Sequence, residues 1–404
     1  MVAATPTAAL QVIVLSAMKT AAYAAAAPPP LIVSLAQYTS RDVILYALGV
    51  GCCADSSDEI QYVYENHHDF APLPSFPLAL SFAALPAASD ASSFAGIRPF
   101  PPHTMEITLP RQFIAADSDF DPSSCPILHI AQSLRLHKPI PMPDLTADAI
   151  YDHPVGVQLV TTILSVSPKD IGTFVTTETQ YRTATEPSNL LFTGTSTALV
   201  VGAPKEAVLS FQRSSNKQSD IFDSIGALSP KRNRQSAPPS FEEIFRINPN
   251  QALLYRLSGD YNAIHVDSDL AAMAIGNHNR KGEGESVPRP VLHGLCSLGF
   301  AVRGVLRFLR QREAAPAITD ACSEVTYLSC RFARPIYVGD KIKVVVWDDG
   351  GSSTCNVKEE VLRFEVLNCA SGKTVIKDGI VAIIARTSTA PDKTPSTSRS
   401  RSRL

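Results

Sequence analysis

Two stretches of the chain alternate apolar and polar residues at successive positions. Alternation with a period of two is typical of a β-strand that buries one face, so each run predicts a strand. The first stretch contains the runs 157–166 and 190–201. The second contains the runs 341–347, 360–367 and 379–384. The pattern therefore predicts a sheet in each half of the chain.

A different spacing predicts one long helix in the second half. Apolar residues recur there every three or four positions, which places them on one face of a helix. They are Leu295, Leu298, Val302, Val305, Leu306 and Leu309, and Pro316 marks the end. We expect this helix to form the core around which the second sheet wraps. Shorter helices are predicted at 41–49 and 58–65, and the segment 69–76 is predicted to lead into a strand.

An internal repeat relates the two halves. The motif Lys138-Pro139-Ile140 reappears as Arg334-Pro335-Ile336 at a constant offset, 334 − 138 = 196. Each copy continues with an aspartate and an aromatic–Asp pair: Asp144 with Tyr151-Asp152, and Asp340 with Trp347-Asp348. A shorter echo places Pro126-Ile127-Leu128-His129 against Pro290-Val291-Leu292-His293. Two copies of one α+β unit are predicted.

The two copies differ in the room they leave for a helix. Pro335 follows His293 by 42 positions, whereas Pro139 follows His129 by only 10. The first copy therefore has no space for a long central helix after His129. A sheet without its core helix either collapses or leaves a cavity, and we expect a cavity.

Composition shifts divide the chain into five parts. An Ala- and Pro-rich extension covers residues 1–36, with disorder or a targeting segment as the two interpretations. The N-terminal repeat is expected at 37–204, a Ser-, Asn- and Pro-rich linker at 205–245, and the C-terminal repeat at 246–388. A Ser- and Thr-rich tail covers 389–404.

Charge and cysteine content exclude several classes of function. The net charge is −2, so bulk electrostatics favours neither nucleic acid nor a membrane surface. No apolar run reaches the roughly 18 residues of a membrane span. The eight cysteines include no C-x-x-C pair, and the nine histidines include no H-E-x-x-H spacing. We expect reduced thiols, no metal and no cofactor.

Candidate chemistry concentrates in the stretch 255–271, which reads YRLSGDYNAIHVDSDLA. Gly259 allows a sharp backbone turn just before Asp260, and His265 follows five positions later. Asp267 and Asp269 precede an apolar run and predict a helix start. Asp260 on a loop and His265 near the helix entry could both reach one water molecule.

This stretch resembles the signature of the 2-enoyl-CoA hydratase 2 family, which includes MaoC-like dehydratases. The matching positions are Tyr255, Leu257, Ser258, Gly259, Asp260, Asn262, Ile264, His265 and Ala271, with Ala263 where the family has proline. The segments 41–51 and 69–76 also look like the start of the family's hydratase unit. The resemblance implies an α+β double hot-dog fold: two repeats of an antiparallel sheet wrapped on a central helix, with the helix reduced in the first repeat. It also implies that the first repeat has lost catalysis and holds the acyl chain.

The resemblance implies hydration of trans-2-enoyl-CoA to (3R)-3-hydroxyacyl-CoA, with acyl-CoA as the substrate. We expect Asp260 to relay protons, His265 to hold the water and Asn262 to orient the loop or the water. The Gly294 N–H, in the motif Leu292-His293-Gly294, is the expected oxyanion donor at the start of the long helix. Substrate binding is assigned to Tyr255, Ser258, Gly259, Leu292 and His293, with a structural role for His293 as the favoured alternative. Val160 is a candidate for the wall of the acyl pocket.

Alternatives stay open at this point. A hot-dog thioesterase or a non-catalytic acyl-CoA-binding protein would share the fold. The basic run 231–234 predicts either a solvated linker or a contact with coenzyme A phosphates. The oligomeric state is open, with a homodimer as one alternative.

The last three residues resemble a peroxisomal address. They read Ser402-Arg403-Leu404, with arginine in place of the lysine of S-K-L. We expect recognition by a peroxisomal import receptor and a place in the peroxisomal matrix and in β-oxidation. A mitochondrial location is the alternative, through the N-terminal extension.

Overall fold

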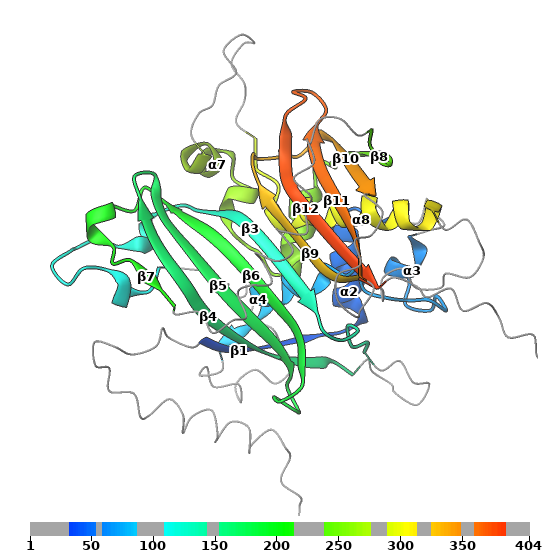
Figure 1. Ribbon diagram of the computed structural model, residues 1–404, viewed down its shortest axis with the longest axis horizontal. Coiled ribbons are helices and arrows are strands. Elements are labelled where there is room, and N and C mark those ends of the chain that lie inside the picture. Colours follow the sequence, from blue (N-terminus) through cyan, green and yellow to red (C-terminus); the bar gives the residue numbers. More distant parts are fainter. Residues whose placement is uncertain are drawn as a thin grey trace, which may run out of the picture.

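The computed structural model describes residues 32–53, 59–86, 109–143, 153–213, 238–275, 289–312, 325–348 and 359–384. Twelve strands in these residues form one antiparallel sheet. In Figure 1 the first half runs from blue through cyan to green, and in the second half β8 is green and β9 to β12 are orange to red. The first half contains β1 (Ile32–Tyr38), β2 (Leu85–Pro86), β3 (Ile127–Leu136), β4 (Val155–Lys169), β5 (Gly172–Thr183), β6 (Leu190–Val201) and β7 (Phe211–Gln212). The second half contains β8 (Phe241–Arg246), β9 (Val325–Phe332), β10 (Lys341–Asp348), β11 (Glu359–Asn368) and β12 (Thr374–Ile384). All five strands predicted from alternation are present, so the antiparallel α+β prediction is confirmed.

The two halves have the same strand order and meet at a local two-fold axis. The order is β1-β4-β5-β6-β3 in the first half and, mirrored, β9-β12-β11-β10-β8 in the second. The halves join where β3 pairs with β9, and Ser133 lies opposite Ser329 in that pairing. Since 329 − 133 = 196, these two serines are equivalent under the repeat offset. The predicted internal repeat is therefore a structural duplication.

The shorter echo between residues 126–129 and 290–293 is wrong as a structural equivalence. His129 lies in β3, whereas His293 immediately precedes the helix α8 (Gly294–Arg312). The offset of 196 instead places the counterpart of α8 at about residues 98–116. The described part of that segment forms only the 3-10 turn η3 (Arg111–Phe113). The ten-residue gap after His129 therefore does not correspond to the position of α8 in the second half.

Helix α8 is the core of the second half, as its apolar stripe predicts. Its buried residues cover nearly all of its turns, and it contacts β8, β10 and β11. Figure 1 shows it in yellow behind the second sheet, next to α2 (Ser40–Gly49). No helix in the described ranges is both long and apolar enough to cross a membrane. Two sheets of the same strand order, joined edge to edge with a long helix packed on the second, form the double hot-dog architecture.

A buried ion pair ties α8 to the N-terminal segment. Arg303 donates to Glu59 at 2.8 Å and to the Val50 carbonyl at 2.9 Å, and both charged side chains are almost fully buried. Glu59 directly precedes α3 (Ile60–Val63). Removing one partner of such a pair leaves an unpaired buried charge. The pair therefore fixes how the segment before β2 packs on the second half.

Three sequence-based expectations differ from the structure. The segment after residue 75 is helical, forming η1 (Phe76–Ala79) and α4 (Leu80–Ala83), because Pro77 has no N–H for a strand ladder and suits the first turn of a helix. Strand β1 starts at Ile32, inside the expected extension. The expected linker contains η5 (Lys205–Ala207), β7 and β8. The basic run 231–234 and the last three residues lie outside the described residues.

Candidate active site

The loop that carries Asp260 is shaped by a glycine. It follows α6 (Gln251–Tyr255) and η6 (Arg256–Ser258), and Gly259 has φ = +126°. A Cβ at this position would lie 2.8 Å from the Ala83 backbone nitrogen. Only glycine therefore allows both the backbone angle and the close approach to α4. Asp260 follows directly, which places its carboxylate where the loop meets the first half of the molecule.

Asn262 organises the turn between the aspartate and the histidine. Its backbone N–H donates to the Asp260 carboxylate at 3.2 Å, and its side-chain oxygen accepts from the Ile264 N–H at 3.3 Å. The 3-10 turn η7 (Ala263–His265) forms with Ala263 where the family pattern has proline. Asp267 then accepts hydrogen bonds from the N–H groups of Asp269 and Leu270, which starts α7 (Ser268–Ile275). The predicted loop, turn and helix entry are all present.

The ring orientation of His265 is fixed by its neighbours. Its Nδ1 lies 2.7 Å from the Val291 carbonyl oxygen, which can only accept, so Nδ1 carries the proton. The Nε2 lone pair of the neutral ring is then available to accept a hydrogen bond. The ring stacks on His293 with centroids 3.6 Å apart, and His293 Nε2 lies 3.1 Å from the Asp260 carbonyl oxygen. One ligand atom each of Asp260, His265 and His293 lie within 4.8 Å of one another.

Burial shifts both ionisable groups of the pair toward their neutral forms. Burial raises the pKa of the Asp260 carboxyl, and the His265 ring and the Asn262 N–H offset part of that rise. Burial lowers the pKa of His265, which Asp260 and the Val291 carbonyl offset in part. Burial and the His265 ring hold the pKa of His293 well below its usual range. At neutral pH both imidazoles are therefore uncharged.

The pair faces a cavity of about 560 Å³ that reaches from the second half deep into the first. Asp260, Asn262, His265, Leu292 and Gly294 all line it. Gly294 is the first residue of α8, where backbone N–H groups have no partner within the helix. A Cβ on Gly294 would contact the Phe332 ring at 3.4 Å. The four residues predicted for catalysis are thus brought together at one end of a single cavity.

Four residues assigned to substrate binding do not line this cavity. Tyr255 and His293 are almost fully buried, and their rings contact each other with centroids 4.8 Å apart. Gly259 packs against the α4 backbone. The Ser258 hydroxyl is buried and has no hydrogen-bond partner among the described residues. These residues pack behind the loop that carries Asp260, and Leu292 alone of the five reaches the cavity.

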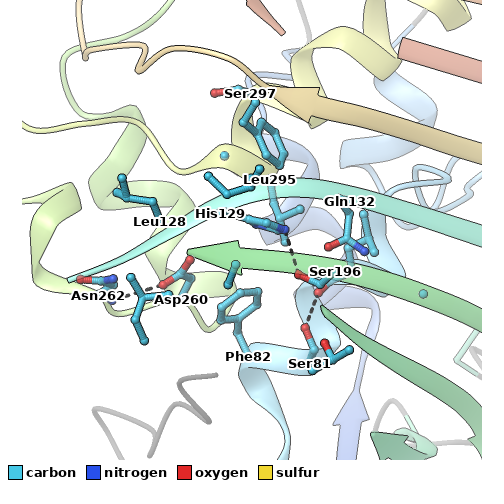
Figure 2. A pocket seen from close by; sticks show the side chains of 18 of the residues that line it. Ser81, Phe82, Leu128, His129, Gln132, Ser196, Asp260, Asn262, Leu295 and Ser297 are labelled. Atoms are coloured by element: carbon cyan, nitrogen blue, oxygen red, sulfur yellow. Dashed lines mark hydrogen bonds between the residues drawn. The ribbon is translucent and has the colours of Figure 1, made fainter. Parts of the chain in front are cut away.

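Sequence reasoning predicted a cavity in the first half but did not identify the residues that line it. Figure 2 shows Asp260 and Asn262 on their loop, with His129, Gln132 and Ser196 on neighbouring strands. Along β4, β5 and β6 every second residue faces the cavity. These residues are Leu159, Thr161, Ile163, Thr177, Thr179, Tyr181, Gly194, Ser196 and Ala198. Val160 lies between two of these residues and points to the other face of the sheet, so the expectation that it forms the wall is wrong.

Two clusters in the described residues could bring three metal ligands together. One is the Asp260, His265 and His293 group at the cavity, and the other is the partly exposed group His67, His68 and Asp69. In the first cluster, two ring nitrogens already lie within hydrogen-bond distance of backbone carbonyls. The ring nitrogens and carboxylate oxygens of this cluster that are not in those contacts could hold a water molecule as well as an ion, which agrees with acid–base chemistry.

Comparison with known protein families finds two matches. The model described as "MaoC like domain" matches residues 231–368, and "MFE-2 hydratase 2 N-terminal domain" matches residues 36–105. The first contains residues 255–271 and α8, and the second contains α2, α4 and the end of β1. The two matches therefore fall on the two segments that meet at Gly259.

Similar proteins are found among curated sequences. The chain is 28% identical over 347 residues to the peroxisomal multifunctional enzyme type 2 of Drosophila melanogaster, covering 85% of this chain and 45% of the relative. It is 28% identical over 320 residues to the peroxisomal enoyl-CoA hydratase 2 of Arabidopsis thaliana, covering 78% and 82%. The chain thus spans less than half of the multifunctional relative and most of the stand-alone one.

Solved structures agree on the fold. A MaoC-like dehydratase from Phytophthora capsici superposes with a TM-score of 0.60 at 23% identity, covering 90% of this chain and 97% of that one. The full-length peroxisomal multifunctional enzyme type 2 from Drosophila melanogaster gives 0.54 at 23% identity, covering 87% and 48%. Both matches extend over both halves of the chain, so they support the duplicated architecture as a whole.

Proposed function

We propose that this chain, which combines a MaoC-like domain with an MFE-2 hydratase 2 N-terminal domain, reversibly hydrates trans-2-enoyl-CoA to (3R)-3-hydroxyacyl-CoA. One observation carries the proposal: the Asp260 carboxylate and the neutral His265 ring line a cavity of about 560 Å³ that extends over the strands of the first half. The two named relatives, an enoyl-CoA hydratase 2 and a multifunctional enzyme, support it.

A water molecule bound to the pair would be activated in a defined orientation. It donates one hydrogen to the Asp260 carboxylate and the other to His265 Nε2, because both of these atoms are acceptors. Its lone pair then points into the cavity toward C3 of the enoyl group. As the C–O bond forms at C3, Asp260 takes the proton, and it then delivers that proton to C2. One carboxylate thus serves as base and then as acid.

Negative charge develops on the thioester oxygen when water adds to C3. The Gly294 N–H at the start of α8 is the donor we assign to this oxygen, since it lines the cavity and the helix N-terminus favours negative charge. Asn262 holds the Asp260 carboxylate through its N–H. Tyr255, Ser258, Gly259 and His293 position the loop and do not touch the substrate in this assignment.

The product formed from crotonyl-CoA tests this function against the two alternatives. A hydratase gives 3-hydroxybutyryl-CoA, a thioesterase releases free coenzyme A, and a binding protein gives neither. Loss of absorbance at the conjugated double bond and chiral analysis of the product distinguish these outcomes. Release of free coenzyme A without hydration would overturn the proposal.

The acyl chain is assigned to the first-half wall, which gives a prediction about chain length. Each buried CH₂ contributes up to ~0.8 kcal/mol, so kcat/KM should rise with the number of carbons before levelling. Thr161→Trp places an indole into the cavity from β4 and should shorten the preferred chain while sparing crotonyl-CoA. Val160→Trp is the matched control because its side chain lies on the other face of the same strand. A series that is flat in the wild-type enzyme would contradict the assignment.

We assign the protein to the peroxisome, as the names of both relatives suggest, and to fatty-acid β-oxidation. Recognition by the import receptor is assigned to Ser402, Arg403 and Leu404. Deleting these three residues should move a tagged chain from peroxisomes to the cytosol without changing its specific activity. Continued peroxisomal import, or a mitochondrial location for the intact chain, would contradict this assignment, and fluorescence microscopy with organelle markers measures it.

A further inference from the structure

The first-half wall of the cavity carries a row of polar side chains where a plain hydrocarbon tail would need apolar ones. Thr177, Ser196 and Gln132 lie on β5, β6 and β3, and they are direct cross-strand neighbours in the sheet. All three line the cavity. Thr161 and Thr179 form a second row beside them, with their hydroxyls 2.9 Å apart. Five polar side chains therefore form a patch on the concave face of this sheet.

His129 completes the patch from the same side. Its Nε2 lies 3.1 Å from the Ser196 hydroxyl, as the dashed line in Figure 2 shows. The ring is held against Phe332 with centroids 4.9 Å apart. Gln132 is held in turn, since its side-chain N–H donates to the Ser133 carbonyl at 2.8 Å. These contacts fix the polar atoms at the cavity surface before any ligand arrives.

The patch is polar but uncharged. Burial lowers the pKa of His129 to about 4, so its ring is neutral at physiological pH. The remaining members are hydroxyls and one amide. A carboxylate or an ammonium group on the ligand would find no counter-charge in the patch. A neutral group that both donates and accepts, such as a hydroxyl, matches it best.

We propose that the acyl pocket contains a polar subsite, formed by His129, Gln132, Thr177 and Ser196, that binds an uncharged oxygen substituent on the acyl chain. The inference rests on the proposed function, since it describes the tail of the same substrate. A hydroxyl or carbonyl at the matching carbon would replace water on these groups. An unsubstituted chain would instead cover them without forming hydrogen bonds, which weakens its binding.

Matched substrates test the subsite. Wild-type kcat/KM is measured for trans-2-decenoyl-CoA and for its 7-, 8-, 9- and 10-hydroxy derivatives. One net hydrogen bond corresponds to about a tenfold change, so at least one derivative should exceed the plain chain by about tenfold. Ser196→Ala should remove that advantage, so that the ratio of kcat/KM for the preferred derivative to kcat/KM for the plain chain falls to about one. Thr195→Val, the neighbouring position on the opposite face of β6, is the control and should keep the advantage.

The outcomes separate this inference from the proposed function. If wild-type enzyme hydrates the plain chain and prefers none of the derivatives, the subsite is wrong and the hydratase assignment stands. If no 2-enoyl-CoA is hydrated, the proposed function is wrong. Thr177→Val replaces Ser196→Ala should that variant not fold, as judged by its melting temperature. If both variants still prefer the hydroxy derivative over the plain chain, the proposed subsite is also wrong.

Discussion

Asp260→Asn is expected to lower kcat for crotonyl-CoA hydration by about 10²- to 10⁴-fold, the range for loss of a general acid–base group. Asparagine keeps the shape of the side chain and can still accept from the Asn262 N–H. The amide cannot take the proton from water, so the variant should fold as the wild type does but lose most of its hydration activity. Stopped-flow or steady-state absorbance assays measure the loss, and circular dichroism verifies the fold.

Asp267→Asn provides a matched control for this substitution. Its carboxylate accepts the N–H groups that start α7, and it does not line the cavity. Asparagine is also a good cap, so activity should stay within a few-fold of wild type. An equal loss in both variants would mean that Asp260 acts through the loop structure, and the proton relay would be contradicted.

The fold was predictable where the signal is local or repeated. Period-two alternation identified β4, β6, β10, β11 and β12, and the apolar stripe identified α8. The offset of 196 also relates Ser133 to Ser329, which lie opposite each other where β3 pairs with β9. A duplicated unit meets its copy across a two-fold axis, so the repeat in the sequence carries tertiary information.

The errors arose where a short similarity or a short apolar run was used alone. The echo between His129 and His293 joined a strand residue to a residue that precedes a helix. The segment at Phe76 is apolar enough for a strand, yet Pro77 starts a helical turn. Short apolar runs do not separate buried strands from buried helices, and flanking residues must decide.

The site shows the same division between local and distant information. Gly259, Asp260, Asn262 and His265 lie within seven residues, so their turn could be read from the sequence. The polar wall takes one or two residues from each of several strands, for example Ser196 and Gln132, and depends on the register of those strands. A shift of one residue would turn each of these side chains to the other face. Such a wall cannot be assembled before the strand pairing is known.

The double variant of the catalytic pair should show that the two groups act as a unit. His265→Ala alone should lower kcat by about 10²- to 10⁴-fold, because the water loses one of its two acceptors. When one group is gone, the water is no longer held in the reactive orientation, and the second group has little left to contribute. Asp260→Asn with His265→Ala should therefore be at most a few-fold slower than the slower single variant. Fully additive losses in the activation free energy would show that the two residues act on separate steps, and a single water shared between Asp260 and His265 would be ruled out.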